Sequence, residues 1–237
     1  MSGALLRAEG VGKRFGGFTA LGGIDLEVRA GERLGLIGPN GSGKSTFTNC
    51  LAGAFPSHDG GFTFKGRALR GLSAHQRAHS GLARTFQLPR PFRGLSVLDN
   101  VRVPLAFGGR DAATPERAME CLDAVELAGK AHRMPRELTQ VELRRLELAR
   151  ATALRPELLI ADEAMAGLSH AEVDQVLALL LRLNEGGMAI VMIEHVMRAV
   201  TQFSQRLVVF VSGRKVADGE PRAVLAMPEV EEAYLGR

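Results

Sequence analysis

Residues 33–46 read RLGLIGPNGSGKST, and they decide the fold. Arg33 to Ile37 is a short apolar run typical of a buried strand, and Gly38 to Ser45 matches the pattern G-x-x-x-x-G-K-[ST]. A glycine-rich turn between a strand and a helix lets consecutive backbone N–H groups point inward around phosphates. The stretch therefore predicts a phosphate-binding loop in an α/β protein.

The chemistry of this loop assigns roles to its side chains. We expect Lys44 to reach the outer phosphates of a nucleotide and the Ser45 hydroxyl to bind Mg²⁺. An ordinary glycine turn is the alternative, and the matching strand and helix on either side argue against it. The predicted nucleotide-binding residues of the loop are Gly38, Pro39, Asn40, Gly41, Ser42, Gly43, Lys44, Ser45 and Thr46.

Two other apolar runs, 158–161 and 189–193, predict strands that are buried on both faces of a parallel sheet. The first ends in Asp162-Glu163, where Asp162 is expected to hold the metal and Glu163 to polarise an attacking water. A pair of solvated acids is the alternative, but the phosphate loop favours a functional pair. His195 follows the second run, and a lone histidine is more often structural.

The remaining patterns predict an α/β core that is split by a helical insertion at about residues 88–155. Alternation within the first 30 residues predicts antiparallel strands with one solvated face. Thr114-Pro115 starts a helix that Gly129 is expected to end, and Ser169 to Glu172 reads as a capping box opening another helix. Residues 207–217 predict a hairpin.

Composition limits the classes of function. A net charge of +4 is too small and too scattered to indicate a nucleic-acid or membrane partner. Cys50 and Cys121 fit neither a metal knuckle nor a disulfide framework and are expected to be reduced thiols. The N-terminus lacks the apolar segment of a signal peptide, and no run approaches the ~18–20 apolar residues that span a bilayer. Any work at a membrane is therefore expected to go through partners.

The order of these motifs resembles the nucleotide-binding subunit of an ATP-binding cassette (ABC) transporter over essentially the whole chain. Residues 84–87 (RTFQ) resemble the Q-loop, residues 167–170 resemble the D-loop, and His195 resembles the switch histidine. Residues 13–17 (KRFGG) resemble the A-loop, which would place Phe15 to stack on adenine. Phe18 is the competing candidate, and either ring could simply belong to the core.

Finer features are similar to ATPase subunits of branched-chain (hydrophobic) amino acid importers. They are RTFQLPRPFRGLSVLDNV, DEAMAGL, IEHVMRAV and PEVEEAYLG. The resemblance implies a single ABC ATPase domain over 1–237 with the P-loop NTPase fold. Residues 1–87 and 156–237 would form the ATP-binding core with its antiparallel β subdomain, and 88–155 the inserted helical subdomain.

The resemblance also implies a mechanism and partners. ATP and Mg²⁺ would bind between two cassettes arranged head to tail. The two cassettes would lie on the cytoplasmic face of the membrane, beneath two permease subunits. An extracytoplasmic binding protein would deliver the transported substrate to the permeases. Glu163 would be the general base, and His195 would bind the γ-phosphate. Gln87 would contact Mg²⁺ or the water and couple the site to the membrane partner. The predicted catalytic residues are Glu163, His195, Gln87 and Lys44, and the metal ligands are Ser45, Gln87 and Asp162.

The chain departs from the family pattern at its signature, which reads Leu138-Thr139-Gln140-Val141-Glu142 where the family has L-S-G-G-Q/E. Val141 replaces a glycine that approaches the partner's ATP, and valine is bulky and resists φ > 0. Arg144, Arg145 and Arg150 follow, and a solvated or packing face is favoured for them over contact with ATP. The D-loop equivalent ends in Ser169-His170, and the capping box accounts for Ser169.

The resemblance implies that the signature acts on the partner's nucleotide, so we hypothesise a heterodimer with unequal sites, with a homodimer as the alternative. This chain's Lys44, Asp162, Glu163 and His195 would hydrolyse ATP, and the site capped by Val141 would be slow. Other readings are an ATP-clamp subunit with little hydrolysis, a transporter of another substrate such as urea or amides, and a non-transport ABC ATPase of DNA repair or translation. No nucleic-acid partner is expected for a single compact cassette.

Overall fold

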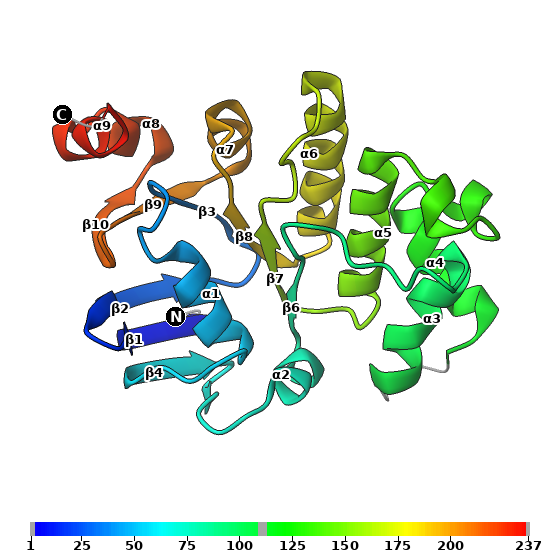
Figure 1. Ribbon diagram of the computed structural model, residues 1–237, viewed down its shortest axis with the longest axis horizontal. Coiled ribbons are helices and arrows are strands. Elements are labelled where there is room, and N and C mark those ends of the chain that lie inside the picture. The colour runs from blue at the N-terminus through cyan, green and yellow to red at the C-terminus, as the bar shows by residue number, and fades with distance from the viewer. Residues whose placement is uncertain (1–2, 109–112, 236–237) are drawn as a thin grey trace.

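The computed structural model describes residues 3–108 and 113–235, which build two β-sheets with helices around them (Figure 1). The larger sheet has the strand order β10-β9-β3-β8-β7-β6. Its neighbouring strands are parallel, except that β10 runs antiparallel to β9. The strands are β3 (Arg33–Ile37), β6 (Leu82–Arg84), β7 (Leu158–Asp162), β8 (Ala189–Ile193), β9 (Arg206–Val211) and β10 (Arg214–Gly219).

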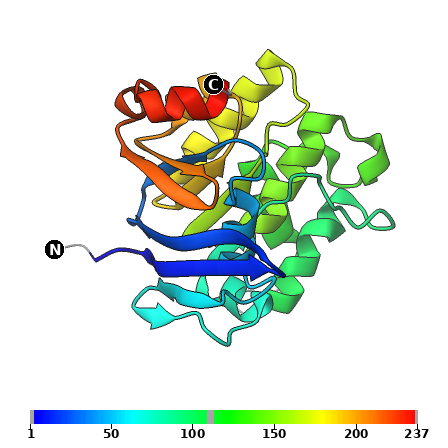
Figure 2. The ribbon, with the colours of Figure 1, turned by 60° about the vertical axis from the view of Figure 1, so that its left-hand side comes forward.

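The smaller sheet is antiparallel and comes from the N-terminal part of the chain (Figure 2). Its order is β2-β1-β4-β5, which confirms the antiparallel strands expected from the alternating pattern. The β9–β10 hairpin is confirmed as well. The strands of the smaller sheet are β1 (Leu6–Phe15), β2 (Phe18–Val28), β4 (Asp59–Phe64) and β5 (Arg67–Ala68).

Side-chain alternation along β7 explains why this strand is apolar throughout. Leu158 and Ile160 belong to a core shared with the antiparallel sheet and with helix α1 (Lys44–Ala52). Leu159 and Ala161 belong to a second core on the helical side. A central strand between two cores has no solvated face, so every position is apolar until Asp162 at its carboxyl end.

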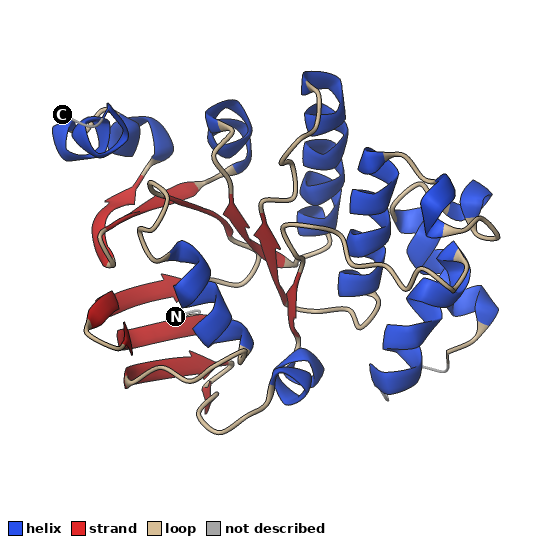
Figure 3. Cartoon of the chain, in the orientation of Figure 1, coloured by secondary structure: helices blue, strands red, loops and turns tan. Residues whose placement is uncertain are grey.

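The helical side is built from one layer on the sheet and a bundle beside it (Figure 3). Helix α6 (His170–Glu185) and helix α7 (Met197–Phe203) share the second core with α3 (Val97–Gly108), α4 (Pro115–Ala124) and α5 (Gln140–Thr152). The remaining helices are α2 (Ala74–Ser80), α8 (Pro221–Leu225) and α9 (Pro228–Leu235). Among the described residues, no helix combines the length and apolar character needed to cross a membrane.

The expected helix starts are confirmed, and one expected helix end is wrong. Thr114 caps α4 with Pro115 following it, and Ser169 and Glu172 form the capping box of α6. Helix α4 stops at Ala124 rather than at Gly129 because Glu126 adopts φ +60°. A residue in the left-handed region cannot continue a right-handed helix.

Candidate functional site

The phosphate loop lies between β3 and α1, as the sequence predicts, and close backbone packing explains its glycines. A Cβ atom at Gly38 would lie 2.1 Å from the carbonyl oxygen of Phe210. A Cβ atom at Gly43 would lie 2.7 Å from the carbonyl oxygen of Ala20, and Gly43 has φ +101°. Any side chain at either position would push the loop away from the strands that hold it, so both glycines are needed for this shape.

Lys44 is the first residue of α1, and its side chain folds back over the loop. Its Nζ atom donates to the carbonyl oxygens of Gly38, at 2.7 Å, and Pro39, at 3.0 Å. Burial lowers the pKa of Lys44, while the nearby charges of Glu163 and Asp162 act in the opposite direction. The positive charge is therefore held inside the loop, at the N-terminus of a helix whose dipole also favours an anion.

The acidic pair stands at the carboxyl end of β7. Asp162 is the last residue of the strand, and Glu163 leaves it with φ +46° while its N–H donates to the carbonyl oxygen of Ile193 at 2.8 Å. The Gln87 side-chain amide donates to the Glu163 carboxylate. The structure thus brings together two residues, 76 positions apart, that the resemblance had placed in one site.

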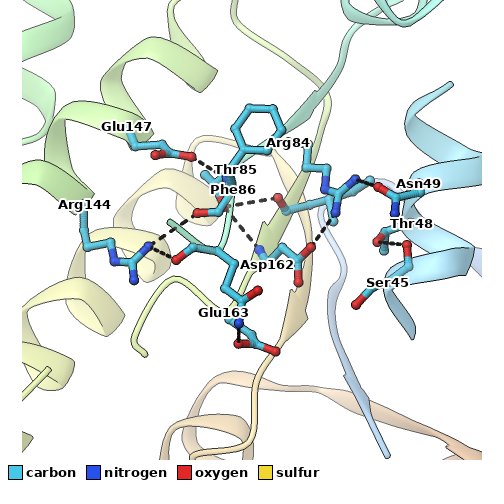
Figure 4. Close-up of polar contacts among 12 residues, drawn as sticks. Ser45, Thr48, Asn49, Arg84, Thr85, Phe86, Arg144, Glu147, Asp162 and Glu163 are labelled. Atoms are coloured by element: carbon cyan, nitrogen blue, oxygen red, sulfur yellow. Dashed lines mark hydrogen bonds and ion pairs between the residues drawn. The ribbon is translucent and has the colours of Figure 1, made fainter. Parts of the chain in front are cut away.

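Asp162 has a buried partner that the sequence did not identify (Figure 4). The Arg84 Nη2 atom lies 2.6 Å from Asp162 Oδ2, and only 14% and 8% of the two side chains are exposed. Arg84 Nη1 also donates to the Asn49 side-chain carbonyl at 2.6 Å. The Thr85 hydroxyl accepts from the Asp162 backbone N–H at 3.1 Å. The predicted metal ligand is therefore fixed at both its backbone and its side chain.

Helix α5, which follows the signature, is clamped to the Q-loop by two buried charges (Figure 4). The Glu147 carboxylate accepts the backbone N–H of Phe86 and, at 3.2 Å, that of Arg90. Arg144 donates to the carbonyl oxygens of Phe86 and Gln87, and at 3.2 Å to that of Ala166. Burial raises the pKa of Glu147, and these backbone hydrogen bonds oppose the shift. Arg144 is only 6% exposed, which excludes a solvated face for it.

The signature corrects one expectation. Thr139 is the N-cap of α5 and forms a capping box with Glu142, so Val141 lies in the first helical turn. Val141 is absent from the residues with positive φ in the described chain, and φ > 0 is therefore no reason to require glycine there. Its side chain is half-buried and packs partly against the helical core. The size of the Val141 side chain is therefore the only remaining difference from the glycine of the family pattern. Gln140 is exposed and Leu138 is buried.

The two candidate adenine-binding rings lie at the β1–β2 turn, where Phe15 and Phe18 are paired in the strand register. They are 48% and 64% exposed, so neither belongs to the core. Phe15 packs edge-on against Phe55, with ring centroids 5.6 Å apart, and Lys13 Nζ lies 5.3 Å from its ring. Both rings are therefore exposed at the surface, and Phe15 is the one held by a neighbouring ring and a cation.

His195 lies in the loop between β8 and α7, with 67% of its side chain exposed. Its Nδ1 atom is 3.9 Å from the buried carboxylate of Glu194. Glu194 Oε1 accepts the backbone N–H of Met165 at 2.7 Å, and burial raises the pKa of Glu194. Within the described residues, no hydrogen bond joins His195 to Lys44 or Glu163.

Known proteins share this architecture. The family model described as ABC transporter matches residues 21–166, more than half of the 237 residues. The chain belongs to the ABC transporter family. It is an ABC ATPase, with the mixed α/β fold of the ATP-binding cassettes that it matches.

Curated relatives and solved structures are similar to this chain over nearly its whole length. The chain is 35% identical to the high-affinity branched-chain amino acid transport ATP-binding proteins BraF of Pseudomonas aeruginosa and LivG of Escherichia coli K12, over 100% of this chain and 99% of each relative. A solved structure of the cassette MJ1267 in its ADP conformation matches with a TM-score of 0.91 and 29% identity, over 99% of this chain and 100% of that one. The dimeric cassette MJ0796 matches with a TM-score of 0.82 and 26% identity, over 92% of this chain and 99% of that one.

Sequence reasoning missed the residues that hold this cassette's site together. Arg84 was noted only as the start of the Q-loop motif, although its place on a strand beside β7 puts it on the same face as Ile160. Glu147 carried a weaker signal, as an acid in the apolar stretch of α5 whose neighbours Leu146 and Leu148 are buried. Such an acid needs partners, and the sequence does not say which backbone groups supply them.

Proposed function

We propose that this chain is the ATP-binding and ATP-hydrolysing subunit of an importer for branched-chain or other hydrophobic amino acids. The observation that carries the substrate class is the 35% identity to BraF and LivG over the full length of the chain. The intact phosphate loop and acidic pair support hydrolysis, because both are needed to place the phosphates and a general base.

Each residue of the site has a defined task in this proposal. Gly38 to Ser45 wrap the phosphates with backbone N–H groups, and Lys44 neutralises the outer phosphates. Glu163 accepts a proton from the attacking water. Gln87, which donates a hydrogen bond to Glu163, orients that water. His195 would bind the γ-phosphate, and Phe15 would stack on adenine, with the Asn40 and Thr46 positions completing the loop contacts.

The donor set fits Mg²⁺. Ser45 offers a hydroxyl oxygen and Asp162 a carboxylate, with the Gln87 amide as a third oxygen, and oxygen ligands are those that Mg²⁺ prefers. Few protein ligands are expected, because Mg²⁺ at such sites is completed by phosphates and water. When bound, the ion would neutralise charge that develops on the phosphates.

We further infer the assembly in which the cassette works. Two cassettes would clamp ATP head to tail beneath two permease subunits at the cytoplasmic face of the cell membrane, with a binding protein delivering substrate from the other side. Residues 1–87 and 156–237 would act as the ATP-binding core and 88–155 as the helical subdomain. Leu138 to Glu142 would cover the partner's nucleotide, and a heterodimer is favoured over a homodimer because Val141 adds bulk there.

Transport tests the substrate class. In liposomes that hold the cassette, its partner cassette, both permeases and the binding protein, leucine should be taken up with ATP, whereas urea and acetamide should not.

Lys44→Ala should weaken ATP binding by about 10- to 100-fold and stop uptake, since a hydrogen bond to a charged group is worth ~1.5–3 kcal/mol. Lys65→Met, which removes an exposed ion pair, is the matched control and should retain transport. Uptake of urea in place of leucine would refute the proposed substrate class. ATP binding without ATP hydrolysis would indicate a subunit that uses ATP only as a clamp.

Val141 gives a separate prediction about the second site. In a transporter carrying Glu163→Gln, the remaining ATP turnover comes from the site that faces this signature. In that transporter we expect Val141→Gly to raise the residual rate of ATP hydrolysis about tenfold. That factor corresponds to ~1.4 kcal/mol, within the range by which a helix N-terminus stabilises an anion that can approach it. Val176→Gly, at a buried position within α6, serves as the control for loss of bulk. An unchanged rate with Val141→Gly would show that the side chain does not slow that site.

A further inference from the structure

Arg84 joins three elements that converge on the proposed metal site (Figure 4). It is the last residue of β6, and its two terminal nitrogens reach different partners. One lies 2.6 Å from the Asp162 carboxylate at the end of β7, and the other 2.6 Å from the Asn49 side-chain oxygen in α1. A single guanidinium therefore connects the strand of the acidic pair to the helix that follows the phosphate loop.

Strand alternation explains why these three side chains meet. Arg84 is paired with Ile160 in the parallel β6–β7 register, so the two side chains point to the same face of the sheet. Ile160 faces the core that contains Phe47, Cys50 and Leu51 of α1. Asp162 lies two residues beyond Ile160 and faces α1 as well. The face of the sheet that carries α1 thus receives both members of the ion pair.

The geometry uses properties that arginine alone supplies. A planar fork with several N–H donors can hold two acceptors in fixed directions, whereas a lysine ammonium is a point charge on a flexible stem. Both side chains of the ion pair are largely buried, so loss of Arg84 would leave an uncompensated carboxylate. The Asn49 contact does not balance any charge, and its effect is to fix the position of α1 relative to Asp162.

Asn49 is four residues after Ser45 on α1 and therefore lies on the same face, one turn along the helix. The Thr48 hydroxyl also donates to the Ser45 carbonyl at 3.2 Å within that turn. A contact that fixes Asn49 therefore fixes the turn that carries the Ser45 hydroxyl.

We propose that Arg84 is a positioning residue that sets the separation between the Ser45 hydroxyl and the Asp162 carboxylate by tying Asp162 to Asn49. The inference rests on the proposed function, in which these two oxygens hold Mg²⁺. Arg84 contacts neither nucleotide nor metal in this account and acts through Asp162 and α1. Residues that orient metal ligands from outside typically contribute 10- to 100-fold to metal affinity.

Binding of ATP to the full chain, measured by equilibrium dialysis across a Mg²⁺ titration and again in EDTA, tests this role. Arg84→Met and Arg84→Lys should raise the Mg²⁺ concentration for half-maximal enhancement of ATP binding by about 10-fold or more. Asn49→Ala retains the ion pair and removes only the contact with α1, and it should raise that concentration about 3- to 10-fold. Binding in EDTA should change less than about twofold in every variant, because the phosphate loop is intact.

Two further variants frame the result. Asp162→Asn should remove most of the Mg²⁺ effect, and Lys65→Met, in the exposed pair with Glu157, should leave it unchanged. If Arg84→Met fails to fold by circular dichroism, Asn49→Ala and Arg84→Lys still decide the question. The proposal is overturned if Asn49→Ala leaves the Mg²⁺ titration unchanged, since Arg84 would then only balance the charge of Asp162, or if Arg84→Lys binds Mg²⁺ as well as the wild type or more tightly.

The same measurements separate this inference from the proposed function. A wild-type chain that binds ATP with no dependence on Mg²⁺, or does not bind ATP, refutes the proposed site and the inference together. Mg²⁺-dependent binding that Asp162→Asn abolishes but that Asn49→Ala and Arg84→Lys leave intact refutes the inference alone.

Discussion

Replacing Glu163 by glutamine in the assembled transporter is expected to lower ATP turnover by about 10²- to 10⁴-fold, the usual contribution of general acid–base catalysis. Glutamine keeps the shape of the side chain and can still contact Gln87, but it cannot take a proton from water. ATP binding should be retained, because Lys44 and the glycines of its loop are unchanged. Steady-state phosphate release and ATP binding are the two measurements.

The matched change in the partner cassette tests the asymmetry of the two sites. If the partner's signature is intact and Val141 slows the other site, replacing the partner's equivalent glutamate should reduce turnover far less than Glu163→Gln does. Glu185→Gln, at an exposed position near the end of α6, controls for the loss of a carboxylate. Loss of turnover with the partner change, while Glu163→Gln is tolerated, would show that the two sites have been assigned the wrong way round.

Glu147→Ala is expected to lower the free energy of unfolding by about 2–4 kcal/mol, because it leaves two backbone N–H groups without their acceptor and a buried arginine charge without its nearby carboxylate. The N–H groups are those of Phe86 and Arg90, and the charge is that of Arg144. Gln87 lies next to Phe86, so the same change should also loosen its contact with Glu163 and lower ATP turnover. Urea unfolding followed by circular dichroism measures the stability.

Glu120→Ala is the comparison for this change. Glu120 is 65% exposed on α4 and pairs with Arg117, which is 18% exposed, and an ion pair whose carboxylate is in solvent contributes about 0–1 kcal/mol. Equal losses of stability for the two alanine variants would show that the contacts of Glu147 with the Q-loop do not hold α5 to the core.

The phosphate loop and the fold class were predictable because they depend on local sequence. The pattern from Gly38 to Ser45 fixes a loop whose shape follows from backbone freedom, and it occurs after an apolar strand and before a helix. The capping residues Thr114 and Ser169 were found for the same reason, since a cap acts on backbone N–H groups three residues away. The end of α4 was misplaced because Glu126, not a glycine, takes the left-handed conformation.

The signature shows how a correct motif can lead to a wrong physical reason. Its position, at the start of a helix with a hydroxyl cap, follows from Thr139 and Glu142 in the sequence. The expectation that a positive φ at this position disfavours valine does not follow from the sequence, because backbone angles depend on where the helix begins. Helical geometry at Val141 leaves the packing of its side chain as the quantity that distinguishes it from glycine.

The sequence by itself determined the phosphate loop, the acidic pair and the expected strands, because each is a short pattern of residues that are close together along the chain, and the order of these patterns indicated the family. The tertiary structure alone decided what holds that machinery in place: Arg84 between Asp162 and Asn49, and Glu147 and Arg144 on the Q-loop. These contacts join residues that are 35 to 78 positions apart. A buried charge announces that it needs a partner, but only the packing of strands and helices determines which one it finds.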